Sequence, residues 1–322
     1  MRFIGRARQI ACIGTGIVGR SWAVAFARGG CVVRLWDPEP ANAARAISLI
    51  EEELEKSSLR DKDEEKNATH GRVQSCSTIE DAISGADYIQ ESAPESLPVK
   101  RELFQRLDAL APHEAILASS TSALHGSQFA GDLTHRSRVL VVHPVNPPHL
   151  IPLVEICPTP WTDADVVQRT MALMTEIGHT PVRVEREIPG FILNRLQWAL
   201  LGEALHLVAI GACTPDDINK VITRGLALRW AFAGPFEIIH LNADAGVRGY
   251  FETLGSSFEK VRKDLHVTHP VTEDVIARVH AAMSERIPEL KIPERQRWRD
   301  DEIRALIRYL DARGSPDNES GQ

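Results

Sequence analysis

Positive charge, paired cysteines and long apolar runs are all scarce in this chain of 322 residues. Its 37 basic residues are outnumbered by 44 acidic ones. The resulting net charge of −7 leaves no basic excess to neutralise nucleic-acid phosphates. We therefore expect no nucleic acid as a partner.

The five cysteines are scattered and include no C-x-x-C pair. This pattern fits neither a disulfide framework nor a zinc site, so a reducing, cytoplasmic location is expected. The 12 histidines show no metal-ligand spacing either, and we predict no metal.

No apolar stretch reaches the length of about 20 residues that a membrane-spanning helix needs. The basic segment at residues 1–9 leads into a strand pattern and lacks the apolar centre of a signal peptide. We expect no membrane association. A chain of this length usually folds as two domains.

Short apolar runs alternate with helical patterns over the first 188 residues. Strands are expected at residues 9–14, 31–36, 73–76, 86–90, 115–118, 139–142 and 182–184, and helices at 17–28, 41–67 and 99–110. Strands that alternate with helices predict an α/β fold, a Rossmann-type doubly wound parallel sheet.

Helical patterns alone follow from about residue 190, so residues 1–188 and 189–313 are expected to form a sheet domain and an all-α domain. Residues 191–210 are apolar on most faces and predict a helix buried on several sides. The polar segment 314–322 is expected to be a disordered tail. So much apolar surface favours a homodimer through the helical domain, although it could instead fill that domain's own core.

A glycine pattern typical of dinucleotide binding joins the first expected strand to the first helix. Gly14 permits a tight turn, Gly16 lets the backbone approach a pyrophosphate, and Gly19 lets helix and strand pack closely. The helix start at Ile17 and Val18 offers backbone N–H groups to phosphate.

Asp37 stands at the end of the second expected strand, 23 residues after Gly14. An acid at this position bonds the ribose hydroxyls of the nucleotide and repels a 2′-phosphate. The sequence therefore predicts NAD as cofactor rather than NADP.

His143 follows the apolar run at residues 139–142, so it lies at the carboxyl edge of the expected sheet, where ligands bind. Glu155 lies inside another apolar run, and a lone acid there needs a partner. Each residue taken alone fits a structural role as well. Together they can act as a general base and the carboxylate that orients it, which the oxidation of an alcohol by NAD requires.

Four motifs in this chain order resemble the L-3-hydroxyacyl-CoA dehydrogenase family. They are S-x-T-S at residues 119–122, H-x-x-N-P-P at 143–148, L-V-E at 153–155 and G-F-x-x-N-R at 190–195. The resemblance implies that His143 is the catalytic base and Glu155 its partner, with Ser122 and Asn194 around the reacting oxygen.

The resemblance also implies that Glu95 and Lys100 help to bind the nucleotide. Without it, Lys100 would be taken for a solvated lysine at a helix start. A role in cofactor binding is therefore an expectation that comes from the family alone.

Further motifs are G-R-S-W at residues 19–22, I-P-L-V-E at 151–155, R-W-A-F-A-G-P at 229–235, H-L-N-A at 240–243 and Q-R-W-R-D at 296–300. They resemble the branch of this family that oxidises the 3-hydroxyl of a sugar acid, L-gulonate. Val145 stands where acyl-CoA members usually have an aromatic residue. Residues 51–66 hold eight acids and four bases, which disfavours anionic CoA, although a solvated helix face has the same composition. Arg229 and Arg195 are candidate partners of the substrate carboxylate, and surface or interdomain ion pairs are the alternative.

Three alternatives to L-gulonate stay open. The substrate could be a short-chain acyl-CoA such as 3-hydroxybutyryl-CoA, or another 3-hydroxy acid such as carnitine. The chain could also be a structural, crystallin-like protein that binds NADH. The Ser122, His143, Glu155 and Asn194 set argues against a purely structural role.

Overall fold

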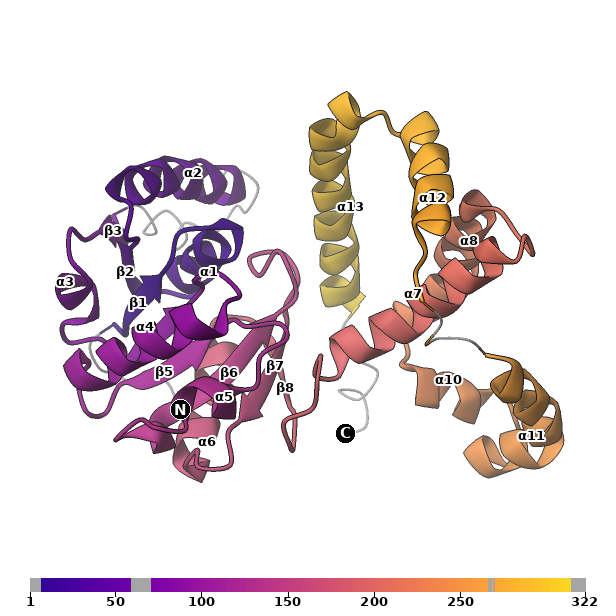
Figure 1. Cartoon of the computed structure of the whole chain (residues 1–322), viewed down its shortest axis with the longest axis horizontal. Helices are drawn as coiled ribbons and strands as arrows, with labels where there is room; N and C mark the ends of the chain where they lie inside the picture. Colours follow the sequence, from indigo (N-terminus) through magenta and orange to yellow (C-terminus); the bar gives the residue numbers. More distant parts are fainter. Residues whose placement is uncertain (1–6, 59–70, 266–267, 269, 314–322) are drawn as a thin grey trace. The chain divides into compact units, whose positions relative to one another are not determined.

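A computed structural model describes residues 7–58, 71–265, 268 and 270–313 (Figure 1). Contacts between residues divide the chain into two compact units, Met1–Arg195 and Leu196–Gln322. The expected tail at 314–322 and the last part of the expected helix at 41–67 lie outside the described residues.

The first unit is built on one eight-stranded sheet in the order β3-β2-β1-β4-β5-β6-β7-β8. The strands are β1 (Gln9–Ile13), β2 (Val32–Trp36), β3 (Val73–Ser75), β4 (Tyr88–Glu91), β5 (Ile116–Ser119), β6 (Val139–Pro144), β7 (Leu153–Pro158) and β8 (Thr180–Arg183). The strands from β1 to β6 are parallel, β7 runs antiparallel to β6, and β8 runs parallel to β7. The predicted doubly wound α/β sheet is confirmed, with two reversed strands at one edge.

Strand β7 is absent from the sequence-based prediction. Pro152 precedes it, Pro158 ends it, and Glu155 interrupts its apolar run. A buried acid is tolerated in a strand only where it has a partner. That partner lies on the neighbouring strand, so a local pattern could not reveal it.

Helices cover both faces of the sheet (Figure 1). Those on one face are α1 (Ile17–Arg28), α2 (Pro40–Ser58) and α6 (Ala164–Glu176). Those on the other are α3 (Ile79–Ile83), α4 (Leu97–Leu110) and α5 (Gly126–Ala130), and the short η2 (Arg136–Arg138) precedes β6. Trp22 and Phe26 anchor the first layer and Phe104 the second, and all three side chains are fully buried. Since β1 to β6 are parallel, their carboxyl ends share one edge, where the candidate site lies.

The described part of the second unit is helical, which confirms the predicted all-α C-terminal domain. Its helices are α7 (Leu193–Ala209, which begins in the first unit), α8 (Pro215–Val221), η3 (Ile222–Leu226), α9 (Ala227–Trp230), α10 (Pro235–Leu241), α11 (Gly246–Asp264), α12 (Glu273–Arg286), η4 (Glu289–Lys291) and α13 (Ile292–Arg313). None of the described helices is both long and apolar enough to cross a membrane.

The expectation that residues 191–210 form a helix buried on several sides is wrong for the single chain. Helix α7 does form, but Leu196 is 64% exposed and Trp198 is 59% exposed. Within the described part of this unit, the buried hydrophobic side chains are Val208 and Val275, each 5% exposed. The unit therefore offers few apolar partners to α7.

Candidate active site

The turn between β1 and α1 has the geometry that the glycine pattern predicts. Gly14 adopts a φ of +93°, and a Cβ there would lie 2.7 Å from the carbonyl oxygen of Ser92. A Cβ on Gly19 would lie 1.9 Å from the carbonyl oxygen of Gly14. At Gly16, by contrast, a Cβ would meet no atom within 4 Å. Two glycines thus serve the turn and the packing, while Gly16 leaves open space above the backbone.

The start of α1 is a ready site for an anion. Gly16 is its N-cap, and no side chain caps the helix there. The first N–H groups of a helix, here from Ile17 and Val18 onward, have no acceptor within the helix and lie at the positive end of its dipole. This arrangement fits a pyrophosphate.

Asp37 directly follows the neighbouring strand β2 and is held by four hydrogen bonds. Its Oδ2 accepts from the backbone N–H and the hydroxyl of Thr15 at 2.9 and 2.8 Å. Its Oδ1 accepts from the N–H of Glu39 and from Asn42 Nδ2 at 3.1 and 3.2 Å. Partial burial acts to raise the pKa of Asp37, but these bonds outweigh it and lower the pKa. The carboxylate is therefore ionised, as the predicted preference for NAD over NADP requires.

A cavity of about 720 Å³ opens between the glycine turn, Asp37 and one face of α4. It is lined by Ile13, Gly14, Thr15, Gly16, Trp36, Asp37, Pro38, Glu39, Asn42, Ser92, Ala93, Pro94, Val99, Glu102, Leu103 and Arg106. The size, the free helix start and the ionised acid fit the adenosine and pyrophosphate part of NAD.

His143 and Glu155 face each other across β6 and β7, where the strand register pairs them directly. His143 Nδ1 lies 2.8 Å from Glu155 Oε2, and both side chains are buried. Because a carboxylate only accepts, Nδ1 of the neutral ring carries the proton and Nε2 keeps its lone pair. The arrangement can therefore take up a proton at Nε2.

Glu155 is also bound by the turn that leads into α7. Its Oε1 accepts from the N–H groups of Ile192 and Leu193 at 2.8 and 2.9 Å. Burial acts to raise the pKa of Glu155, but the bonds from His143, Leu193 and Ile192 lower it overall. The ionised carboxylate can stabilise a positive charge on His143.

Phe191 shapes this turn. It adopts a φ of 50°, which is uncommon for a residue other than glycine, and it is fully buried. Its ring centroid lies 5.3 Å from that of His143. Strained backbone of this kind is often found at functional sites.

Asn194 and Ser122, the other two residues predicted around the reacting oxygen, are joined to each other. Asn194 Nδ2 donates to the backbone carbonyl of Ser122 at 3.1 Å. Asn194 also follows directly after Leu193, whose N–H binds Glu155. The structure therefore links the four predicted residues within the first unit.

Glu95 and Lys100 have partners within the protein. Glu95 Oε1 accepts from the hydroxyl of Thr121 at 2.5 Å and lies within 3.4 Å of the next three backbone nitrogens. Lys100 is 1% exposed and donates to Glu91 at 2.8 and 3.0 Å. Sequence reasoning missed Glu91, although an acid at the end of an apolar strand and nine residues before a lysine could have signalled it.

The two arginines predicted for the substrate lie in different units. Arg195 Nη1 lies 3.5 Å from the carbonyl oxygen of Pro189. Arg229 lies on α9 of the second unit. Their joint role stays a prediction. Among the described residues, no three His, Cys, Asp or Glu side chains are placed to hold a metal ion.

The fold, the cavity and the histidine–carboxylate pair define the class of NAD-dependent dehydrogenases. The chain belongs to the 3-hydroxyacyl-CoA dehydrogenase family. The family's NAD binding domain matches residues 9–188, and its C-terminal domain matches residues 190–281. The protein is therefore an NAD-dependent oxidoreductase.

Several relatives match nearly the whole chain. It is 38% identical over 309 residues to lambda-crystallin of Oryctolagus cuniculus, covering 94% of this chain and 96% of the relative. It is 36% identical over 314 residues to L-carnitine dehydrogenase of Pseudomonas sp, covering 96% of each. A solved structure of 5-formyl-3-hydroxy-2-methylpyridine 4-carboxylic acid 5-dehydrogenase, an NAD⁺-dependent dismutase, is similar with a TM-score of 0.81 and 28% identity, covering 95% of this chain and 99% of that one.

Proposed function

We propose that the protein oxidises the 3-hydroxyl of L-gulonate to 3-dehydro-L-gulonate with NAD. The observation that carries the proposal is the buried 2.8 Å contact between His143 and Glu155, which equips the site to take a proton from an alcohol. The likeness to lambda-crystallin and the sequence motifs that resemble L-gulonate 3-dehydrogenase support the choice of substrate.

The proposed reaction moves one proton and one hydride. His143 Nε2 takes the proton of the 3-hydroxyl, and Glu155 stabilises the imidazolium that forms. Ser122 and Asn194 orient the reacting oxygen and limit its movement. NAD, when bound, would supply the acceptor for the hydride that leaves carbon 3. The products are the ketone, NADH and the proton that His143 later releases to water.

Asp37, the glycine turn and the start of α1 hold the cofactor in this proposal. Asp37 would accept hydrogen bonds from the ribose hydroxyls, and Gly16 would leave room for the pyrophosphate. Arg195 and Arg229 are proposed as partners of the substrate carboxylate, because a guanidinium matches a carboxylate with two parallel hydrogen bonds.

L-carnitine is the second candidate substrate, since L-carnitine dehydrogenases match the chain at similar identity and coverage. Like L-gulonate, it is a 3-hydroxy acid, so the same histidine could serve both reactions. The two substrates differ in charge, because carnitine also carries a quaternary ammonium.

The test is NADH formation by the purified protein with NAD and, in parallel, L-gulonate, L-carnitine and 3-hydroxybutyryl-CoA. We expect the highest kcat/KM with L-gulonate. A clear preference for either other compound would overturn the choice of substrate. Stoichiometric NADH binding with no turnover of any of the three would instead favour a structural, crystallin-like role.

We also propose a homodimer formed through the helical unit, in the cytoplasm. Large apolar side chains are exposed on α7, α10 and α11, and a second copy of the chain would cover them. All five cysteines are free, which suits a reducing compartment.

A further inference from the structure

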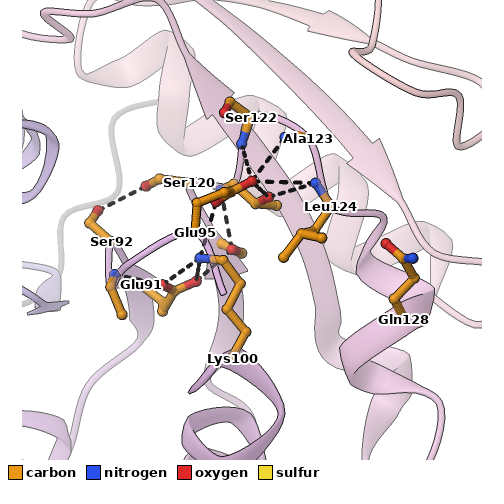
Figure 2. Close-up of polar contacts among 12 residues, drawn as sticks. Glu91, Ser92, Glu95, Lys100, Ser120, Ser122, Ala123, Leu124 and Gln128 are labelled. Carbon is orange, nitrogen blue, oxygen red and sulfur yellow. Dashed lines mark hydrogen bonds and ion pairs between the residues drawn. The ribbon is translucent and has the colours of Figure 1, made fainter. Parts of the chain in front are cut away.

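Glu91 and Lys100 form a buried ion pair at the carboxyl end of β4 (Figure 2). Their side chains are 0% and 1% exposed, and the ammonium contacts both carboxylate oxygens. Burying two charges is costly and is tolerated only where hydrogen bonds satisfy both groups. Because the burial of this pair is costly, we looked for a role of the pair in the site.

Lys100 lies on the face of α4 that is turned away from the cofactor cavity. The buried positions of this helix include Lys100, Phe104 and Leu107, which follow the helical repeat. The residues of α4 that line the cavity are instead Val99, Glu102, Leu103 and Arg106. The ammonium is thus directed to Glu91 and not into this cavity.

Two short paths lead from this pair to the turn at residues 121–124. Ser119 Oγ donates to Glu91 Oε2 at 2.5 Å and accepts from the N–H of Thr121 at 3.2 Å. On the other path, Lys100 Nζ lies 3.7 Å from Glu95 Oε2.

Glu95 in turn holds the same turn by its other oxygen (Figure 2). Its Oε1 accepts from the hydroxyl of Thr121 and from the N–H of Ala123 at 3.0 Å, and the N–H of Ser122 lies at 3.2 Å. Partial burial acts to raise the pKa of Glu95, but the bond from Thr121, the charge of Lys100 and the backbone bonds from Ala123 and Leu124 lower it overall. The turn therefore closes around an ionised carboxylate.

We propose that Glu91 and Lys100 are positioning residues for Ser122, acting on its turn through Glu95 and Ser119. The inference rests on the proposed role of Ser122 at the reacting oxygen.

The test uses the double variant Glu91→Gln/Lys100→Met, which removes the pair without leaving one charge buried alone. Gln105→Met, an exposed position on the same helix, is the matched control. We expect the double variant to bind NADH, followed by fluorescence, with a Kd within about twofold of wild type. We expect its kcat to fall by about 10- to 100-fold, since small misplacements at a reacting centre cost that much.

Hydrogen–deuterium exchange of the amides at 121–124 gives a readout that needs no substrate. We expect exchange there to become faster by about tenfold in the double variant and unchanged in the control. Should the double variant not fold, Ser119→Ala breaks one path with little loss of volume and should also speed exchange at Thr121.

Weaker NADH binding with unchanged kcat and exchange would overturn the inference, because Lys100 would then serve the cofactor. Unchanged values in all three measurements would overturn it too. If wild type fails to oxidise L-gulonate, only the proposed substrate falls. NADH binding and exchange still test the inference, and kcat is then measured with whichever of the three compounds is turned over.

Discussion

At the scale of single residues, we expect the charge on Asp37 to control which nucleotide the cavity accepts. Its carboxylate is held ionised by Thr15, Glu39 and Asn42. Asp37→Asn removes the charge that repels a 2′-phosphate and keeps the shape of the side chain. We expect the ratio of kcat/KM for NADP to that for NAD to rise about tenfold or more, as the loss of one close like charge implies. An unchanged ratio would show that Asp37 does not face the ribose.

Glu155 makes the stability of the fold depend on pH. Burial acts to raise the pKa of Glu155, but the bonds from His143, Leu193 and Ile192 lower it in the folded protein. The unfolded chain therefore binds a proton more readily, so the contribution is present above the ordinary pKa of about 4.3 and is lost as pH falls through the folded value.

Glu155→Gln should remove this dependence. We expect the free energy of unfolding to fall less between pH 6 and about pH 4 in the variant than in wild type, as measured by urea denaturation. An equally steep fall in both proteins would mean that Glu155 is not stabilised as an anion.

At the scale of elements, two glycines between β1 and α1 have different roles: Gly19 allows close packing, and Gly16 leaves space for the cofactor. Gly19→Ala places a Cβ against the carbonyl of Gly14, so we expect it to lower the free energy of unfolding by about 1–3 kcal/mol. Gly16→Ala meets no atom within 4 Å, so we expect it to change that free energy little and to weaken NADH binding. Equal losses of stability in thermal melts of the two variants would contradict this division.

Most elements of the first unit could be predicted because alternating strands and helices leave a strong local pattern. The predicted helix at 17–28 forms at those residues, and the predicted doubly wound sheet forms as well. Strand β7 could not be predicted, since its buried Glu155 depends on His143 of β6. Pairing between strands that are distant in the sequence cannot be recognised from the residues of one segment alone.

The candidate site could also be predicted only in part. His143 and Glu155 were predictable from an acid and a histidine in apolar runs, together with the family motifs. The family resemblance also pointed to Lys100, but its burial could not be predicted, because a lysine near a helix start is usually solvated and this one is paired with Glu91 of a separate strand.

At the scale of the whole molecule, the exposed apolar side chains of the helical unit predict its oligomeric state. Phe236 is 78% exposed and Leu241 is 69% exposed on α10, besides Trp198 on α7. We expect sedimentation equilibrium at micromolar concentration to give twice the chain mass of 35.7 kDa.

Charged variants locate the interface. Trp198→Glu and Phe236→Glu should shift the population towards monomer, because a buried charge without a partner opposes association. Leu110→Glu, an exposed apolar position on α4 of the first unit, should leave the dimer intact. A monomeric wild-type protein would refute the proposed dimer.

The central claim is that His143, oriented by Glu155, takes the proton of a 3-hydroxy acid while NAD accepts the hydride. The most direct measurement is the single-turnover rate of NADH formation by His143→Ala beside wild type, with the preferred substrate and with NADH binding as a check of folding. We predict a rate lower by about 10²- to 10⁴-fold with NADH binding retained, since general base catalysis contributes that much. A folded variant that forms NADH at the wild-type rate would contradict the account.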